Sequence, residues 1–290
     1  MTSESPSASI SEAPPVTEEL PLSSWEEYQP AIAAIERRFG SHDKGDGRAH
    51  ENRIAYRGQK SGAWALETTL EREGGPRQFT VHQYYERATR HHRELESITG
   101  RTWPLPSDAE LKEVFTRNAD SLHVSAPAYP YLVYLRHHGF PSPFLDWSLS
   151  AYVAAFFAFE SADQTKDERV AVYAYVDTPL GTKAGFIGAP IITLLGPHVA
   201  TDRRHFMQQA VYTWCVKQEG EGDDYTICSH HDVLRTPSEQ QHTLLRITLP
   251  TSERRTALRD LQAHNINHYT LFGTEDALAR TLALRAFLLD

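Results

Sequence analysis

The stretch YLVYLRHHGFPSPFLDWSLSAYVAAFFAFE, residues 131–160, organises the rest of the chain. It begins with a helical apolar rhythm, breaks at Gly139 and two prolines, and places Asp146 and Trp147 directly before a second apolar helix. A short irregular segment with polar side chains therefore lies between two elements that can both be buried. Because such packing fixes the geometry of the segment, the pattern predicts a functional site around Asp146.

The composition is that of an ordinary globular protein. The chain has 290 residues, of which 40% are hydrophobic and 10% aromatic, so one large domain or two small ones can bury a core. Its formal net charge of −9 argues against broad, sequence-independent binding of nucleic-acid phosphates, although a local basic patch is compatible with this average.

The cysteines and histidines do not form a metal or redox motif. Cys215 and Cys228 are the two cysteines, and neither belongs to a CxxC pair. The sequence has no apolar signal region and no run long enough to span a bilayer, so we expect a cytoplasmic protein without membrane contact. The 15 histidines include the pairs His91-His92, His137-His138 and His230-His231, which lack metal-site spacing, and we expect no metal.

The pattern of elements predicts a short tail followed by one domain. Residues 1–22 are rich in Ser, Pro and Glu and are expected to be disordered. Residues 23–290 are expected to form a single α+β domain with a helical N-terminal half, because strands dominate only later and regular βαβ alternation is missing. Ser24, with Glu27 three residues later, predicts a capping box for a first helix that ends near residue 39.

The remaining expected elements follow from hydrophobic periodicity. Helices are expected over residues 67–72, 79–99, 108–122, 253–264 and 274–289, and strands or extended segments over residues 53–59, 64–66, 170–176, 210–216, 244–249 and 269–272. We find no internal repeat and none of the patterns GxGxxG, GxxxxGKS/T, GxSxG and HExxH.

Several short motifs occur in a characteristic order. They are Tyr56-Arg57-Gly58-Gln59, Trp64-x-Leu66, Leu70-x-Arg72, Phe144-Leu145-Asp146-Trp147-Ser148 with Ser150, VAAFFA at residues 153–158, and RHFMQQAVYT at residues 204–213. In this order they resemble the FRG domain family, which is named after its Phe/Tyr-Arg-Gly motif. The resemblance covers roughly residues 50–290 and implies one FRG-type domain.

The chain departs from the family pattern at three places. Where the family usually has Gln-His-Tyr-Gly, this chain has RHHG at residues 136–139. Where the family usually has Pro-Thr-Arg-Leu-Leu-Asp-Trp, Pro143 stands in place of the arginine, so a second cationic contact is not expected there. Ala210 replaces the usual glycine.

The same blocks are more distantly similar to ADP-ribosyltransferases, and this likeness implies a split mixed or antiparallel sheet and NAD as the substrate. A guanidinium such as that of Arg57 suits the NAD pyrophosphate. Gly58 allows the backbone to approach the nicotinamide carboxamide. The rings of Trp147 or Tyr152 are expected to stack on the pyridinium ring.

Cleavage of the glycosidic bond of NAD passes through an oxocarbenium-like state that a carboxylate stabilises. The late block of this chain has Gln208 and Gln209 in place of the usual glutamate, so Asp146 or Glu160 is expected to supply the charge. The expected catalytic residues are Asp146, Glu160, Gln209 and His137, and the expected NAD contacts are Tyr56, Arg57, Gly58, Gln59, Trp147, Ser148, Ser150, Tyr152 and Gln208.

Structural explanations stay open for the same residues. Arg57 is also explained by an ion pair with Asp146, and Asp146 by the N-cap of the following helix. Trp147 is also explained as a core residue, and Ser148 and Ser150 as helix-start residues.

Two classes of function follow. The first is an NAD-dependent mono-ADP-ribosyltransferase or NAD glycohydrolase that acts on a macromolecule, protein or nucleic acid; the resemblance implies a bacterial toxin or anti-phage effector with an antitoxin-like partner. The second is a non-catalytic module that binds a nucleotide or a partner. A nuclease comes third, because no cluster of metal-binding carboxylates is evident.

The structure can distinguish the first two classes. Ligand binding predicts that Arg57, Asp146 and Gln209 line one open pocket, whereas a buried and fully paired Arg57 favours the structural explanation.

Overall fold

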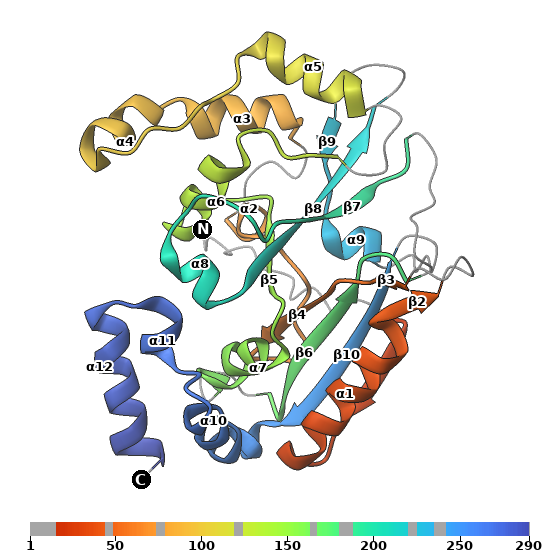
Figure 1. Ribbon diagram of the computed structural model, residues 1–290, viewed down its shortest axis with the longest axis vertical. Coiled ribbons are helices and arrows are strands. Elements are labelled where there is room, and N and C mark those ends of the chain that lie inside the picture. Colours follow the sequence, from red (N-terminus) through yellow and green to blue (C-terminus); the bar gives the residue numbers. More distant parts are fainter. Residues whose placement is uncertain are drawn as a thin grey trace, which may run out of the picture.

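The computed structural model describes residues 16–43, 49–73, 79–118, 124–162, 167–179, 188–219, 225–234 and 242–289. Most of its strands form one mixed sheet in the order β1-β10-β6-β4-β5-β8-β7, with β9 paired to β8 (Figure 1). The strands of this sheet are β1 (Glu18–Pro21), β4 (Ile54–Gln59), β5 (Leu145–Ser148), β6 (Arg169–Val176), β7 (Ile191–Leu195), β8 (Ala210–Gln218), β9 (Tyr225–Ile227) and β10 (Thr243–Pro250). Strands β2 (Ser41–Asp43) and β3 (Ala49–Glu51) pair separately.

Helices pack around both ends of this sheet. Figure 1 shows α3, α4 and α5 gathered beyond β8 and β9, and α1, α7 and α10 around β4, β6 and β10. The α-helices are α1 (Tyr28–Phe39), α2 (Thr69–Arg72), α3 (Val81–Thr89), α4 (His92–Thr99), α5 (Asp108–Asn118), α6 (Tyr129–His137), α7 (Ala151–Phe159), α8 (Arg203–Met207), α9 (His230–Leu234), α10 (Arg254–Ala263), α11 (His268–Phe272) and α12 (Glu275–Leu284).

The fold confirms a mixture of α and β structure built on a mixed parallel and antiparallel sheet. β1 runs parallel to β10, and the other pairs in the sheet are antiparallel. The helical N-terminal half is not confirmed, because β1, β4 and β5 all precede residue 149.

Strand β6 shows why an uninterrupted apolar run lies at the centre of the sheet. Val172 and Val176 face the core formed with α1 and α7, whereas Tyr173 and Tyr175 face a second core on the opposite side of the sheet. All four side chains are buried. A strand that is covered on both faces needs apolar residues at every position, which confirms the strand predicted over residues 170–176.

The sheet forks between β4 and β5. These two strands pair at one position, where Tyr56 lies opposite Ser148. Beyond that pair, β4 stays with β6 as far as Gln59, and β5 stays with β8 as far as Leu145. The backbones of residues 57–59 and 145–147 therefore diverge, and the fork provides the position of the functional site.

Gly58 is explained by the packing of α7 against β4. A Cβ atom at Gly58 would lie 1.9 Å from the carbonyl oxygen of Ala154 and 2.7 Å from the backbone nitrogen of Ala158, both in α7. The helix approaches the strand this closely because its inner face carries alanines. Close approach of a helix, rather than a tight turn, is therefore what requires glycine at this position.

Some of the expected local elements are wrong. Ser24 makes no capping hydrogen bond through its side chain; Glu27 instead accepts from the backbone nitrogen of Ser23 at 3.0 Å, and the helix begins with a 3₁₀ turn, Trp25–Glu27. The helix expected over residues 79–99 is divided into α3 and α4 at His91, whose backbone leaves the helical region at φ −111° and ψ 20°.

The expected tail and the expected extended segment near the C-terminal end also need correction. Residues 18–21 form β1, because their backbone groups extend the edge of the sheet beside β10; residues 1–15 lie outside the described residues. Residues 268–272 form α11 instead of an extended piece. The Asn267 side chain accepts from the Thr270 backbone nitrogen at 3.1 Å and the Thr270 hydroxyl accepts from that of Asn267, so a reciprocal cap starts the helix.

Candidate functional site

A cavity of about 380 Å³ lies at the fork between β4 and β5. It is lined by residues of both strands, of β8 and of α7, by Phe272, and by side chains from α2, α6 and α8. We call it the arginine cavity, because Arg57, Arg72, Arg136 and Arg204 all line it. Asp146 is the acidic residue of this lining.

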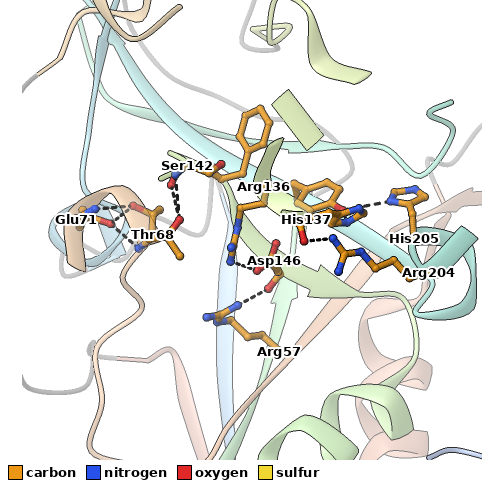
Figure 2. A network of polar contacts seen from close by, with 12 residues as sticks. Arg57, Thr68, Glu71, Arg136, His137, Ser142, Asp146, Arg204 and His205 are labelled. Carbon is orange, nitrogen blue, oxygen red and sulfur yellow. Dashed lines mark hydrogen bonds and ion pairs between the residues drawn. The ribbon is translucent and has the colours of Figure 1, made fainter. Parts of the chain in front are cut away.

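Arg57 reaches Asp146 through the backbone and not through an ion pair. Its Nη1 donates to the Asp146 carbonyl oxygen at 2.7 Å (Figure 2). That carbonyl is free to accept because β5 has separated from β4 at this point. Burial lowers the pKa of Arg57 to about 10, so the guanidinium stays charged at neutral pH. The expected structural pair between the two side chains is therefore wrong.

The Asp146 carboxylate pairs with Arg136 of α6 instead. Figure 2 shows the two guanidinium groups of Arg57 and Arg136 converging on Asp146 from different elements. A second cationic contact was not expected at Pro143, and Arg136 supplies one to Asp146 from α6.

The other two arginines are held by short helices. Arg204 of α8 donates to the His137 carbonyl oxygen. Arg72 lies at the end of α2, whose start is fixed by a capping box between Thr68 and Glu71. The same helix is fastened to the segment before β5, because the backbone nitrogen of Ser142 lies 3.0 Å from Thr69 Oγ1 (Figure 2). Residues 68–72 and 136–146 are therefore positioned relative to one another.

A chain of hydrogen bonds runs from the arginine cavity into the protein. The Pro197 carbonyl oxygen lies 2.6 Å from His205 Nε2, and because a carbonyl only accepts, this nitrogen carries the proton. Burial lowers the pKa of His205, so its Nδ1 is unprotonated and accepts from the Tyr212 hydroxyl at 3.2 Å. The Tyr212 oxygen then accepts from His137 Nε2 at 2.7 Å.

This order of donors fixes the state of His137. Its proton lies on Nε2, and its Nδ1 is buried without a hydrogen-bond partner. Burial, assisted by the positive charge of Arg204, lowers the pKa of His137 to about 4. His137 lines the arginine cavity as a neutral imidazole, and so low a pKa makes it a weak general base at neutral pH.

A second cavity, of about 580 Å³, adjoins the first. We call it the Trp64 cavity. It shares Arg57, Gly58, Arg72 and Phe157 with the arginine cavity, and it adds Gln59, Lys60, Trp64, Glu67 and Glu160 among others. Burial raises the pKa of Glu160, and the Glu160 Oε2 atom lies 3.4 Å from His268 Nε2. The expected carboxylates Asp146 and Glu160 therefore line neighbouring cavities.

The late glutamines are separated by the turn between α8 and β8. Gln208 lines the arginine cavity, and its Nε2 donates to the Leu271 carbonyl oxygen at 3.1 Å. Gln209 adopts a positive φ of 48° and is exposed, outside both cavities. The expectation that Gln209 shares a pocket with Arg57 and Asp146 is therefore wrong, because this turn directs it to the surface.

The expected stacking residues are committed to other contacts. Trp147 borders the arginine cavity, but its indole is only 4% exposed and its Nε1 donates to Thr213 Oγ1 at 2.8 Å within the core. Tyr152 packs edge-on against Tyr28 at a centroid distance of 5.9 Å and lines neither cavity. Trp147 is therefore packed into the core at the edge of the arginine cavity, and Tyr152 lies outside both cavities.

The remaining predicted residues divide between the cavities and the start of α7. Tyr56 lines the arginine cavity from β4, and Gln59 lines the Trp64 cavity. The Ser148 hydroxyl donates to the Gln208 carbonyl oxygen at 2.7 Å, and Ser150 caps α7 by accepting from the Val153 backbone nitrogen. The N-cap role considered for Asp146 is wrong, because Asp146 lies within β5.

Residues that sequence reasoning did not assign to the site are Arg72, Arg136, Arg204, Tyr212 and His205. Arg136 directly precedes His137, which was predicted as a site residue, so its position in the sequence already pointed to the site. Arg204 and Tyr212 join the site because β8 pairs with β5, with Asp146 opposite Tyr212, and this register is not visible in the sequence.

Two further findings concern the described residues. No three His, Cys, Asp or Glu side chains among them gather as metal ligands would. No helix in this part of the chain has the length and apolar character needed to cross a membrane.

Comparison with known proteins supports the family resemblance over part of the chain. Residues 52–167 match the family model of the FRG domain. Neither the curated proteins nor the solved structures contained a match to this chain. The matching region begins before β4 and ends after α7, so it contains Arg57, Arg72, Arg136 and Asp146, whereas Arg204 lies beyond it. The region that matches the FRG domain model therefore contains three of the four arginines of the cavity.

Proposed function

We propose that the arginine cavity binds the phosphate groups of a nucleotide, with NAD as the first candidate. The observation that carries this proposal is its charge: four guanidinium groups face one carboxylate, and His137 is neutral. Guanidinium groups are well suited to phosphate because they are planar, permanently charged and able to donate two parallel hydrogen bonds.

Unsatisfied donors support the same proposal. The Nε atoms of Arg57, Arg136 and Arg204 are buried without a hydrogen-bond partner. A buried donor without an acceptor is unfavourable. The binding of an anionic ligand that accepts hydrogen bonds from these side chains is therefore favoured. The cavity volume of about 380 Å³ also falls within the range usual for small-molecule sites.

Calorimetric titration with inorganic pyrophosphate and with NAD tests the proposal. Arg204 and its neighbour Arg203 provide a matched pair on α8, because Arg204 lines the cavity and Arg203 is exposed outside it. We expect Arg204→Gln to weaken pyrophosphate binding roughly 10- to 100-fold, the value of a charge-assisted hydrogen bond. Arg203→Gln should bind like wild type. Equal affinities of the two variants would count against the arginine cavity as the binding site.

A second candidate is cleavage of NAD, with transfer of ADP-ribose to a macromolecule or to water. Glu160 favours it, because this carboxylate lines the Trp64 cavity next to Arg57 and Arg72. Its contact is with His268, so Glu160 does not take part in the pair between Asp146 and Arg136. Asp146 is less suited to stabilise a developing oxocarbenium ion, since Arg136 already compensates its charge. In this proposal the fork corresponds to the split sheet of ADP-ribosyltransferases.

Incubation of labelled NAD with the protein and a cell lysate distinguishes the two candidates. Cleavage predicts label transfer or nicotinamide release that Glu160→Gln abolishes and that Arg57→Ala weakens. If the protein binds NAD without cleaving it, the cleavage candidate is rejected and the nucleotide-binding candidate stands. A macromolecular acceptor, a toxin or anti-phage role and an antitoxin-like partner remain predictions of the resemblance.

A further inference from the structure

The Trp64 cavity contains an exposed aromatic ring beside the proposed phosphate site. Trp64 is 38% exposed, whereas Trp25, Trp147 and Trp214 are buried. It lines the cavity together with Arg57 and Gly58, which also line the arginine cavity. The Lys60 Nζ atom lies over the Trp64 ring, 5.3 Å from its centroid, so a second ring stacks on the opposite face or displaces this side chain.

The segment that carries Trp64 is fastened on both sides. The Gln59 side chain donates from Nε2 to the Ala65 carbonyl oxygen at 3.2 Å. The Gly62 backbone nitrogen donates to the Arg169 carbonyl oxygen at 2.9 Å. These bonds tie the backbone on both sides of Trp64 to β4 and β6, so the segment that carries the ring is in place before any ligand arrives. A segment that is already ordered loses little conformational entropy on binding.

The two cavities differ in charge. The arginine cavity has Asp146 as its carboxylate, whereas the Trp64 cavity contains Glu67 and Glu160 in addition to its cations. Carboxylates accept hydrogen bonds from amino and carboxamide groups and repel phosphate. The phosphate end of a ligand is therefore favoured on the arginine side, and an uncharged or amino-bearing ring on the Trp64 side.

We propose that the Trp64 cavity binds the base of the same nucleotide whose phosphates occupy the arginine cavity, with the base stacked on Trp64. This inference rests on the proposed phosphate site and extends it by naming the ligand class: a nucleotide with a base carrying an amino or carboxamide group. Arg57 and Gly58 line both cavities, so the two binding regions meet at this end of β4.

Paired titrations with inorganic pyrophosphate and with ADP test the inference on the full chain. Wild type should bind ADP more tightly than pyrophosphate, because ADP adds the stacked base. Trp64→Ala should weaken ADP binding roughly 5- to 150-fold, the range found when a base-stacking aromatic is removed, and leave pyrophosphate binding unchanged. Trp64→Phe keeps an aromatic face and should retain most of the ADP affinity.

The outcomes separate this inference from the proposal on which it rests. If wild type binds both ligands and Trp64→Ala binds ADP as tightly as wild type does, the base site is overturned while the phosphate site stands. If wild type binds neither ligand, both fail. A loss of pyrophosphate binding in Trp64→Ala would also overturn the inference, since the ring would then act on the arginine cavity, and thermal unfolding of the variants identifies any loss of fold.

Discussion

Arg57 and Asp146 are joined through the backbone of Asp146, whose carbonyl oxygen accepts from Arg57 Nη1 at 2.7 Å, while the carboxylate of Asp146 pairs with Arg136. A change of the Asp146 side chain therefore leaves the contact with Arg57 intact. It acts on the charge of the arginine cavity and on Arg136.

Asp146→Asn should strengthen the binding of anions. The substitution removes the negative charge opposite four guanidinium groups, and one charge at close range contributes about 1 kcal/mol even when well screened, or roughly a fivefold gain in affinity for pyrophosphate. Isothermal titration at low salt measures this gain. Asp276→Asn makes the same change in net charge on the exposed start of α12 and should have no effect. Weaker binding by Asp146→Asn would show that the carboxylate itself contacts the ligand.

Gly58→Ala should destabilise the fold. The added Cβ would lie 1.9 Å from the Ala154 carbonyl oxygen, so α7 must move away from β4. Overpacking of this kind costs about 1–3 kcal/mol of the free energy of unfolding, which urea denaturation measures. Gly62→Ala is the matched control, because its Cβ would meet the nearest atom at 3.5 Å, an ordinary contact. Equal stabilities of the two variants would contradict the packing explanation for Gly58.

Tyr212→Phe should destabilise the protein by about 1–3 kcal/mol, because it removes the hydroxyl that joins His137 to His205 and leaves both rings short of a partner. Tyr129→Phe provides the comparison. The Tyr129 hydroxyl is buried without a hydrogen-bond partner, so its removal should cost little or nothing. Chemical denaturation of the two variants checks the difference, and a Tyr129→Phe variant that is as unstable as Tyr212→Phe would argue against the hydrogen-bond chain.

Stability should rise with pH through the weakly acidic range. Burial lowers the pKa of His137 from its usual 6.5 to about 4 and that of His230 to about 3. Between about pH 4 and 6.5 the unfolded chain therefore binds more protons than the folded one, so the free energy of unfolding increases with pH over this interval and levels off above it. Urea denaturation at a series of pH values measures the slope. A flat or falling profile would mean that these imidazoles are accessible to protons in the folded state.

Part of the fold was predictable because local pattern and burial agree. The strand over residues 170–176 was identified from an uninterrupted apolar run, and the structure shows why every position is apolar. The structure brings Arg57, His137 and Asp146, which the sequence singled out, into the lining of one cavity. They could be singled out because polar groups next to glycine, tryptophan or apolar helices are costly to bury unless they have partners.

The incorrect predictions concern residues whose position depends on strand pairing or on the conformation of a turn. Asp146 and Trp147 are adjacent in β5, and neighbours in a strand face opposite sides, so the Asp146 carboxylate pairs with Arg136 in the arginine cavity whereas the Trp147 ring packs into the core behind it. Sequence reasoning treated the segment as irregular and assigned both to the site. Gln209 was expected to face inward, but its positive φ directs it outward, and nothing in the sequence next to it signals that turn. Arg204 was missed because its position depends on the pairing of β5 with β8.

Titration of the wild-type chain with inorganic pyrophosphate at two salt concentrations shows whether the fork holds a phosphate-binding site. We expect saturable binding at one site, with an affinity that falls as salt screens the guanidinium groups. The absence of both binding heat and any rise in the unfolding temperature at millimolar pyrophosphate would contradict it.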